Sequence, residues 1–373
     1  MKKVLFCAST SSHIKNFHLP YLKAFGDAGY KVFTAAADER LFDDTAGCFV
    51  LPLKKSLLSP SNVSAIFAAR KLLLKEKFDV ISLHTTLAAA VVRAALLTIP
   101  KAHRPKVFYI CHGYLFKETD GAAALKYLIP EKMCAPVTDV LMVMNDEDER
   151  LAKKHSLYKD KLFYINGMGL PDEKFSIPDL NEHIDAKKRL GFDEKDRLFV
   201  CSAELSKRKN QAVLIKAFAK VIGDMPNAYL LLAGKGDERQ NYEQLCQSLN
   251  LGDRVRFLGF VEDVPALLAA ADGYLSASFS EGLPFAVMEA LAAGLPAALS
   301  DAKGHRELCR IGGFAKIFKD EAELCELLKT LYALPQNRFE YELSKFMLSS
   351  VLPEINAVYF EQYEKTKEKV GTL

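Results

Sequence analysis

The sequence predicts an α/β protein built from two doubly wound parallel sheets. Short apolar runs of strand length alternate with amphipathic stretches of helix length along the chain, as in β–α–β units. The alternation pauses once, over a polar stretch that contains Pro171 and Pro178, and then restarts. A chain of 373 residues is also longer than one hydrophobic core usually supports. We therefore expect two Rossmann-like domains, with a cleft where the carboxyl ends of both sheets meet.

In the first half, apolar runs and helical periodicity place the elements in order. The strands are expected at residues 4–8, 30–36, 80–83, 107–111, 137–144 and 162–165. The helices are expected at residues 17–28, 63–75 and 87–97. Gly29 ends the first of these helices. Together these elements define a first domain over residues 1–170.

The second half repeats this architecture without repeating the sequence. Its strands are expected at residues 198–202, 229–233, 255–258, 274–277 and 297–299. Its helices are expected at residues 211–221, 242–249, 264–270 and 284–293, and the tail over residues 340–369 has the pattern of two more. We place a linker at residues 171–195 and a second domain at residues 196–351.

Cysteine and hydropathy patterns argue against a secreted or membrane-spanning chain. The eight cysteines include no Cys-x-x-Cys pair and lie mostly in apolar runs, as expected for reduced thiols rather than for disulfides or a zinc site. The longest apolar region, residues 87–99, is interrupted by Arg93 and is too short to cross a bilayer. We expect a cytoplasmic protein that is not integral to a membrane.

Charge is distributed unevenly along the chain. Residues 1–170 hold 24 Lys+Arg and 16 Asp+Glu, whereas residues 171–373 hold 26 and 31. A basic first half predicts contact with an anionic membrane surface or an anionic acceptor, although accidental surface charge explains the pattern equally well. The basic residues expected on that surface are Arg70, Lys71, Lys75, Lys77, Arg93, Lys101, Arg104 and Lys106.

The most informative segment is residues 276–290. It contains a predicted strand end, a turn at Gly282 and a helix whose first turn includes Pro284. The N–H groups of such a turn and the positive end of the helix dipole form an anion site suited to phosphate. Glu281 and Glu289 lie at the two ends of this element, where carboxylates would suit sugar hydroxyls. Taken alone, an acidic first turn and a surface glutamate explain the segment better.

The wider context resembles the nucleotide-sugar motif of glycosyltransferase family 4, in which two Glu are separated by seven residues. The matching positions are Glu281, Gly282, Pro284, Glu289, Ala290, Ala292, Gly294 and Pro296. Other segments are similar to the family and occur in the family's order. They are residues 206–211, 230–236 and 255–264 upstream of the motif and residues 304–308 downstream of it. The resemblance implies a GT-B fold, whose C-terminal helix, here residues 352–373, crosses back to the first domain.

The resemblance also implies roles for individual residues. Lys209 would bind the donor diphosphate and neutralise the charge that grows on this leaving group. Glu289 would bind the ribose hydroxyls, and Glu281 would hold the donor hexose. The other donor-binding residues that it implies are Ser206, Arg208, Gly234, Val261, Gly282 and Leu283.

One position departs from the family pattern. Glu204 stands where the family usually has an Arg on the diphosphate, and a carboxylate cannot neutralise phosphate. Lys207 or Arg208 would have to replace part of that charge. We interpret Glu204 as a feature of a polysaccharide-biosynthesis branch of the family rather than as a sign of inactivity.

The first half offers histidines near predicted strand ends. Residues 109–116 resemble the His-Gly-Phe loop of the same branch, which implies that His112 faces the donor sugar near the reacting carbon. His13 and His18 belong to the first loop and the start of the helix after it, and are acceptor-side candidates. His84 is more readily explained as structural. Residues 146–148 spell Asp-x-Asp, but the preceding Asn145 marks a capped, acidic helix start instead of a metal site.

The resemblance implies a retaining glycosyltransferase, metal-independent and without a cofactor, with His112, Glu281 and Lys209 as catalytic residues. It would move a hexose or N-acetylhexosamine from a nucleotide-diphosphate sugar, UDP-linked in the first instance, to a lipid-linked saccharide in bacterial capsule or exopolysaccharide synthesis. It would work at the inner face of the plasma membrane. The alternatives are a GT-B-fold sugar-nucleotide epimerase and a non-catalytic nucleotide-sugar-binding protein. Nothing in the motifs favours nucleic acid as a partner.

Overall fold

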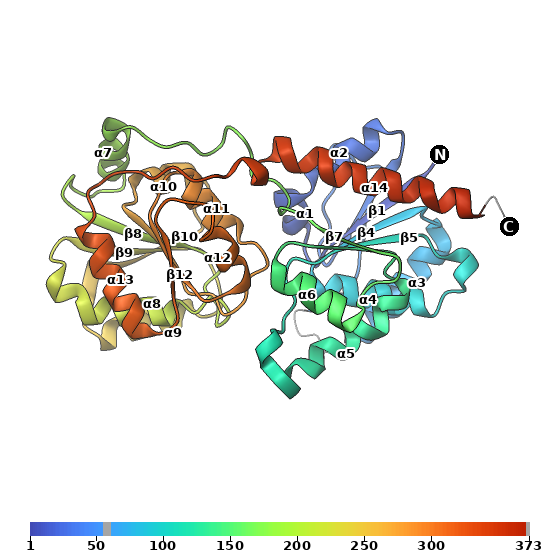
Figure 1. Ribbon diagram of the computed structural model, residues 1–373, viewed down its shortest axis with the longest axis horizontal. Helices are drawn as coiled ribbons and strands as arrows, with labels where there is room; N and C mark the ends of the chain where they lie inside the picture. The colour runs from blue at the N-terminus through green and yellow to red at the C-terminus, as the bar shows by residue number, and fades with distance from the viewer. Residues whose placement is uncertain (55–60, 371–373) are drawn as a thin grey trace. The chain divides into compact units, whose positions relative to one another are not determined.

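The computed structural model describes residues 1–54 and 61–370, and the chain divides into two compact units (Figure 1). Unit 1 comprises Met1–Gly169 together with the C-terminal helix from Leu348, and unit 2 comprises Leu170–Met347. Each unit contains one parallel sheet with helices on both faces. The predicted α/β class with two doubly wound sheets is therefore confirmed.

Within the described residues 1–54 and 61–169, the sheet of unit 1 has seven parallel strands in the order β3-β2-β1-β4-β5-β6-β7. The strands are β1 (Lys3–Cys7), β2 (Lys31–Ala36), β3 (Gly47–Val50), β4 (Val80–His84), β5 (Lys106–Ile110), β6 (Val140–Val143) and β7 (Lys161–Tyr164). β1 and β4 are paired in the middle, in register from Val4 with Val80. β3 was not expected, and it is a short edge strand that is only partly buried.

Helices cover both faces of this sheet. They are α1 (Ser11–Phe17), α2 (Leu19–Asp27), α3 (Ser61–Glu76), α4 (Thr86–Leu97), α5 (Leu125–Cys134), α6 (Asp146–His155) and α14 (Leu348–Val370), with short 3-10 turns η1 (Lys101–His103), η2 (Glu118–Ala124) and η3 (Ala135–Val137). α2 and α14 lie over one face, and α3 and α4 lie over the other (Figure 1). The helix expected at residues 17–28 is α2, which begins after His18 because Pro20 occupies its first turn.

The C-terminal helix α14 belongs to unit 1, as the family resemblance implied. Tyr359 is buried in it, and its hydroxyl lies 2.5 Å from Ser82 Oγ of β4. Phe25 of α2 packs edge-on against Tyr359 at a centroid distance of 5.2 Å. The expected pair of helices in the tail is wrong. A single helix starts at Leu348, and the residues before it contain only the 3-10 turn η6 (Ser344–Phe346).

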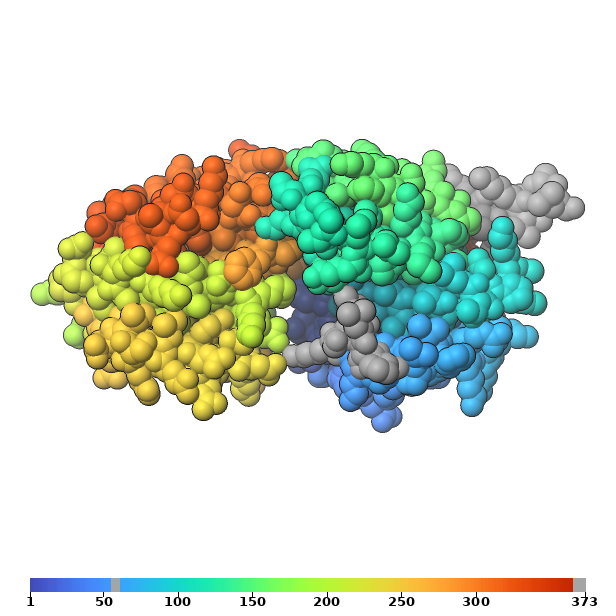
Figure 2. Space-filling model, turned by 90° about the horizontal axis from the view of Figure 1, so that it is seen from below, coloured from blue at the N-terminus to red at the C-terminus, as the bar shows by residue number. Residues whose placement is uncertain are grey.

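The sheet of unit 2 has six parallel strands in the order β10-β9-β8-β11-β12-β13. The strands are β8 (Arg197–Ser202), β9 (Ala228–Ala233), β10 (Val255–Gly259), β11 (Gly273–Ser276), β12 (Ala297–Ser300) and β13 (Ala315–Phe318). The helices are α7 (Leu180–Arg189), α8 (Gln211–Val221), α9 (Arg239–Ser248), α10 (Val264–Ala270), α11 (Phe285–Ala292), α12 (Lys303–Leu308) and α13 (Glu321–Ala333), with 3-10 turns η4 (Ile222–Asp224) and η5 (Gly252–Arg254). Within this unit, Figure 2 shows α13, α8 and α9 side by side on one face, coloured orange, yellow-green and yellow in that order.

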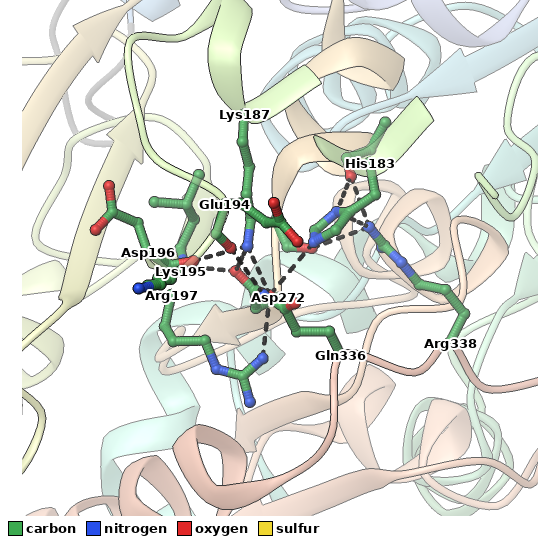
Figure 3. Close-up of polar contacts among 12 residues, drawn as sticks. His183, Lys187, Glu194, Lys195, Asp196, Arg197, Asp272, Gln336 and Arg338 are labelled. Carbon is green, nitrogen blue, oxygen red and sulfur yellow. Dashed lines mark hydrogen bonds and ion pairs between the residues drawn. The ribbon is translucent and has the colours of Figure 1, made fainter. Parts of the chain in front are cut away.

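The segment expected as a linker, residues 171–195, contains helix α7 and lies in unit 2. Asp179 caps this helix and forms a capping box with Glu182. A buried charge network then fixes α7 to the sheet, because Lys187 Nζ lies 2.9 Å from Asp272 Oδ2 and both side chains are almost fully buried. Figure 3 shows side chains from α7, β8 and the segment after α13 converging on Asp272.

Candidate functional site

The strand order of unit 2 reverses between β8 and β11. The segments that follow these two strands therefore leave the sheet on opposite sides of a shared crevice. Open parallel sheets bind ligands at this point, outside the carboxyl ends of the strands. The segment after β8 carries Lys209, and the segment after β11 carries Glu281. The two segments are tied together, because the Phe279 amide donates to the Arg208 carbonyl at 3.0 Å.

Lys209 and Glu281 form an ion pair in this crevice. Lys209 Nζ donates to Glu281 Oε1 at 2.5 Å, and both side chains are mostly buried. Arg208 Nη1 lies 3.4 Å from the same carboxylate oxygen and also donates to the Ser280 carbonyl at 3.1 Å. Three of the predicted site residues are therefore brought together by the structure, from positions more than 70 apart in the chain.

The charges around Glu281 keep its carboxylate ionised. Burial alone would raise the pKa of this carboxyl group, but the neighbouring Lys209 and Arg208 outweigh burial and lower the pKa of Glu281 to about 2. The cations are thus held close to one another by one carboxylate. The arrangement places two positive side chains at the crevice where an anion would bind.

Two helices begin at this crevice without a side-chain cap. The N-cap residue of α8 is Asn210, which has a left-handed backbone and makes no capping hydrogen bond. The N-cap residue of α11 is Pro284, which likewise offers no cap, and the helix starts at Phe285 rather than including Pro284. The positive ends of both helix dipoles therefore lie beside Lys209 and Glu281, which favours phosphate.

Helix α12 contacts the backbone of the turn that carries Glu281 and Gly282. Gly304 donates its amide to the Glu281 carbonyl at 3.3 Å, and a Cβ at Gly304 would collide with the Gly282 carbonyl oxygen. His305 is fully buried next to it, with Nε2 3.1 Å from Ser276 Oγ and Nδ1 2.8 Å from the Ser300 carbonyl. The sequence motif placed this segment downstream of the site without showing that it supports the turn.

The other predicted donor residues lie in the segments that follow strands β8, β9, β10 and β11 of the same sheet. Ser206 Oγ is buried and has no hydrogen-bond partner among the described residues. Leu283 is buried behind the turn, and Val261 is half-buried in the turn between β10 and α10. Gly234 follows β9, where a Cβ would collide with the Ala203 carbonyl oxygen. The missing side chain of Gly234 therefore leaves room for this carbonyl of the protein's own backbone.

Glu289 differs from Glu281 in its electrostatic surroundings. It lies in the last part of the short helix α11 and is half-buried. Burial raises its pKa above the ordinary value, and Lys174 opposes this only in part. The two glutamates of the motif therefore have pKa values that are shifted in opposite directions.

Glu204 is exposed, and its carbonyl oxygen accepts a hydrogen bond from the Gln211 side chain at 2.9 Å. Of the two cations expected to replace the missing Arg, Arg208 approaches Glu281. Lys207 instead extends into solvent, 4.0 Å from Glu238. The geometry therefore favours Arg208 over Lys207.

In unit 1 the strand order reverses between β1 and β4, and histidines gather at this point. His13 lies in α1, His18 between α1 and α2, and His112 directly after β5. The ring centroids of His13 and His112 are 4.7 Å apart, and those of His13 and His18 are 5.2 Å apart. His84, at the end of β4, packs against His18 at a centroid distance of 3.6 Å, with the two rings tilted by 34°.

These imidazoles are neutral at neutral pH because burial disfavours their charged form. Burial lowers the pKa of His13 to about 4 and holds the pKa of His18 and His112 well below the usual value. One nitrogen from each of these three rings lies within 4.8 Å of the others, a spacing that could hold a metal ion. Sequence reasoning expected no metal-ligand cluster, because the three residues show no ligand spacing along the chain.

His84 and its neighbour are engaged in structural contacts. His84 Nε2 lies 2.9 Å from Ser82 Oγ, as expected for a structural histidine. Thr85 has a φ of 65°, a rare conformation for a β-branched residue. Its hydroxyl accepts from the Ser9 amide at 3.0 Å and so joins the loops after β1 and β4.

The acidic segment after β6 is a capped helix start, as predicted. Asn145 Oδ1 accepts from the Asp148 amide at 2.8 Å, and Asp148 in turn accepts from the Tyr114 amide at 3.3 Å. The Glu147 carboxylate accepts from the Glu118 amide at 3.0 Å. The acidic groups therefore position the loop that follows His112.

The expected basic surface is only partly correct. Arg93 is fully buried, with Nη2 2.9 Å from Glu131 Oε2 and its guanidinium 4.1 Å from the Tyr109 ring centroid. Its prediction as a surface contact is wrong, because the apolar helix α4 faces the core on this side. Lys106 is largely buried beside Asp160. The members of the set that are exposed are Lys71, Lys75, Lys77 and Lys101.

Two hollows of unit 2 lie away from the motif. One, of about 510 Å³, is lined by residues of α9 and the start of β10, including Cys246 and Phe257. Another, of about 270 Å³, lies between α7 and α10 and includes Lys174. Neither lining includes Lys209 or Glu281. The site is therefore identified by its charged groups and topology rather than by cavity size.

Comparison with known proteins places this chain among sugar-transferring enzymes. The family model described as "Glycosyl transferases group 1" matches residues 183–342. The protein named "Putative glycosyltransferase EpsD" from Bacillus subtilis (strain 168) is 33% identical over 338 residues, which cover 90% of this chain and 88% of the relative. The UDP-Gal:alpha-D-GlcNAc-diphosphoundecaprenol alpha-1,3-galactosyltransferase of Escherichia coli is 29% identical over 279 residues, covering 72% and 70%.

Solved structures share the fold at low sequence identity. Sucrose-phosphate synthase from Thermosynechococcus elongatus has a TM-score of 0.78 at 17% identity and covers 98% of this chain and 100% of its own. HepE from Anabaena, solved in complex with UDP-glucose, has a TM-score of 0.68 at 19% identity, with both chains covered fully. The lipopolysaccharide-biosynthesis glycosyltransferase WaaG has a TM-score of 0.70 at 17% identity, covering 96% and 94%. The expected GT-B fold is thereby confirmed.

Proposed function

Since the chain belongs to the group 1 glycosyl transferases, we propose that it moves a hexose or N-acetylhexosamine from a UDP-sugar to a lipid-linked saccharide. The observation that carries the donor half of this proposal is the Lys209–Glu281 pair, which lies at the strand-order reversal of unit 2. The E. coli relative is named for a UDP-sugar donor and a diphosphoundecaprenol acceptor. That name supports both halves of the proposal.

The donor diphosphate would bind to the two cations and the two helix N-termini described above. Lys209 and Arg208 supply positive charge where the leaving phosphate becomes more negative, which lowers the barrier to cleavage of the sugar–phosphate bond. Glu281 would accept hydrogen bonds from hexose hydroxyls, and Glu289 would accept them from the ribose. A nearby metal is not required in this scheme, because the diphosphate charge is met by side chains and helix dipoles.

We propose retention of configuration by front-face displacement. The acceptor hydroxyl would attack the anomeric carbon on the side from which the diphosphate leaves, and the departing phosphate oxygen would take the hydroxyl proton. His112 would lie near the reacting carbon, and His13 and His18 would contact the acceptor. The neutral state of these imidazoles suits hydrogen bonding to sugar hydroxyls rather than to phosphate.

The donor can be tested without knowledge of the acceptor. Purified protein is incubated with UDP-, GDP- and ADP-sugars in the presence of EDTA, and release of nucleoside diphosphate is measured. Release from a UDP-sugar is expected, because water slowly replaces the acceptor. Binding of a sugar nucleotide with no release, even after addition of membrane lipid extract, would favour the non-catalytic alternative, to which the exposed Glu204 also points. Net conversion of the sugar nucleotide to an epimer would favour the epimerase.

A lipid-linked acceptor requires the protein to reach a membrane surface. No helix in the part of the chain that the structure describes is long and apolar enough to cross a bilayer. Helix α5, however, exposes an apolar stripe at helical spacing. Leu125, Ile129 and Met133 are 48%, 52% and 63% exposed. The exposed Lys126 and Lys132 flank this stripe, and such a pairing of apolar and basic groups suits an anionic lipid surface.

Membrane contact through α5 is tested by sedimentation with vesicles. The protein should bind vesicles of phosphatidylglycerol more strongly than vesicles of phosphatidylcholine, and added salt should weaken binding. Ile129→Asp should reduce binding, whereas Leu180→Asp, at a comparably exposed position of α7 in unit 2, should not. Equal binding by both variants would exclude α5 as the contact surface.

A further inference from the structure

The histidines at the strand-order reversal of unit 1 form a compact nitrogen cluster from two separate segments. His13 lies in α1, and His18, five residues further on, lies between α1 and α2. His112 comes from the loop after β5. The nearest available nitrogens of all three lie within 4.8 Å of one another. The fold therefore builds this cluster from parts of the chain that are almost 100 residues apart.

These ring nitrogens lack partners where a buried polar atom normally has one. His18 is completely buried, and neither Nδ1 nor Nε2 has a hydrogen-bond partner in the described structure. Nε2 of His13 and Nε2 of His112 are also buried and unpaired among the described residues. Each unsatisfied buried polar atom destabilises the folded chain. Four such atoms in one cluster indicate that another group completes it.

We propose that His13, His18 and His112 together bind a divalent transition-metal ion, with Zn²⁺ as the preferred one. Three imidazoles suit Zn²⁺, whereas Mg²⁺ and Ca²⁺ prefer oxygen ligands. Tetrahedral Zn²⁺ with bonds of about 2.0–2.1 Å needs nitrogens about 3.3 Å apart. The three nitrogens, which lie within 4.8 Å of one another, would have to close to this spacing for all three to bind one ion. Three protein ligands leave the fourth position of a tetrahedral ion open to water or another small ligand.

The other groups at the cluster are consistent with a metal bound by nitrogen alone. His84 packs against His18 with tilted rings and pairs Nε2 with Ser82 Oγ, while its buried Nδ1 has no hydrogen-bond partner among the described residues. His84 does not belong to the group of nitrogens that lie within 4.8 Å of one another. The neighbouring Cys111 is fully buried in the hydrophobic core of unit 1. This site lies wholly in unit 1 and does not depend on the proposed transferase activity.

The site is tested by titration of tag-free, chelator-treated protein with Co²⁺, whose visible absorption reports the ligands. We expect one equivalent of Co²⁺ to bind, with the visible bands of a low-coordinate nitrogen site and without a thiolate charge-transfer band. Zn²⁺ should displace it. His13→Gln and His112→Gln should each weaken binding by about 100-fold or more, because even loss of an outer-shell partner costs about 10–100-fold.

Controls separate the cluster from other metal-binding groups and from misfolding. His103 is exposed in η1, so His103→Gln should bind Co²⁺ like the wild type. Zn²⁺ should also raise the unfolding temperature of the wild type and of His103→Gln, but not that of His112→Gln. Wild-type binding no tighter than that of His112→Gln, or loss of binding in His103→Gln, would overturn the proposal. If His112→Gln is already unfolded before Zn²⁺ is added, His13→Gln takes its place in this test. The ring of His13 is partly accessible in the wild type.

Discussion

Lys209 Nζ lies 2.5 Å from Glu281 Oε1, so the cation assigned to the donor diphosphate is neutralised by the carboxylate assigned to the donor sugar. Arg208 shares the same carboxylate oxygen. A diphosphate that binds here competes with Glu281 for both cations. Glu281 therefore weakens binding of the nucleotide while it orients the sugar, and the two effects can be separated experimentally.

The first prediction concerns the variant Glu281→Gln. Loss of the carboxylate removes a negative charge close to the diphosphate and releases Lys209 and Arg208. UDP should bind about threefold tighter or more, because like charges this close repel even at a high effective dielectric. Release of UDP from a UDP-sugar should fall by about 100-fold or more, as expected for a lost transition-state contact. Calorimetry with UDP and the hydrolysis assay measure these two effects.

The matched control is Glu326→Gln, which removes an exposed carboxylate from α13 in the same unit. It should change neither UDP affinity nor UDP release. Weaker UDP binding by Glu281→Gln would show that Glu281 positions the cations for the phosphate instead of competing with it. Unchanged UDP release would remove Glu281 from the catalytic residues.

The second prediction concerns the pH dependence of stability. The pKa of Glu281 is lowered from 4.5 to about 2 in the folded chain. A carboxyl group with a depressed pKa stabilises the fold above its unfolded pKa and loses this contribution as pH falls towards the folded value. The contribution amounts to about 3 kcal/mol at most, at about 1.4 kcal/mol per pKa unit.

Urea unfolding of the wild type and of Glu281→Gln from pH 7 to pH 3 checks this. The difference in unfolding free energy should be constant above about pH 5 and shrink as the pH falls below about 4.5. A difference that stays constant down to pH 3 would contradict the depressed pKa.

Much of unit 2 could be predicted from the sequence because its determinants are local. The strand ends, the turn at Gly282 and the uncapped start of α11 all follow from residues within one short segment. The meeting of Lys209 and Glu281 follows from the rule that parallel strands end at the same edge of a sheet. The distance between these two side chains and the ion pair that they form do not follow from this rule.

Other features depend on contacts between distant segments, and no local pattern reveals them. Arg93 interrupts an apolar run, which suggested an exposed face. Glu131 on another helix instead supplies the counter-charge that compensates the burial of the guanidinium. The histidine cluster requires that the loops after β1 and β5 meet, and each histidine alone has an ordinary structural explanation. Helix α7 was hidden in a polar stretch because its anchor, Asp272, lies 85 residues beyond Lys187.

The third prediction uses Gly304, which supports the Glu281–Gly282 turn from α12. A Cβ at this position would collide with the backbone carbonyl of Gly282. Gly304→Ala should therefore displace the turn, lower the unfolding free energy by about 1–3 kcal/mol and weaken UDP-sugar binding. Gly223→Ala is the control, because nothing lies within 4 Å of the added methyl group. Equal stability and UDP-sugar affinity in both variants would show that the turn does not depend on α12.

The fourth prediction concerns the charge network around Asp272. Lys187 Nζ, Arg197 Nη1 and the Leu198 amide all contact this carboxylate, and Lys187 is fully buried. Asp272→Asn leaves the buried ammonium without its counter-charge, so we expect a loss of about 3–5 kcal/mol in unfolding free energy. Urea denaturation measures the loss. Lys188→Met, at the exposed neighbour of Lys187, should change stability by less than about 0.5 kcal/mol.

The fifth prediction joins the proposed metal site to the proposed activity. If His112 lies beside the reacting carbon, a metal ion on His13, His18 and His112 occupies the place of the acceptor hydroxyl. Zn²⁺ should then inhibit sugar transfer with the affinity found by competition against Co²⁺, and EDTA should restore the rate. Mg²⁺ should have no effect, since it prefers oxygen ligands. His13→Gln, compared with its own metal-free rate, should need about tenfold more Zn²⁺ or more for the same inhibition. Zn²⁺ that binds without slowing transfer would keep the metal site but move the acceptor away from these histidines.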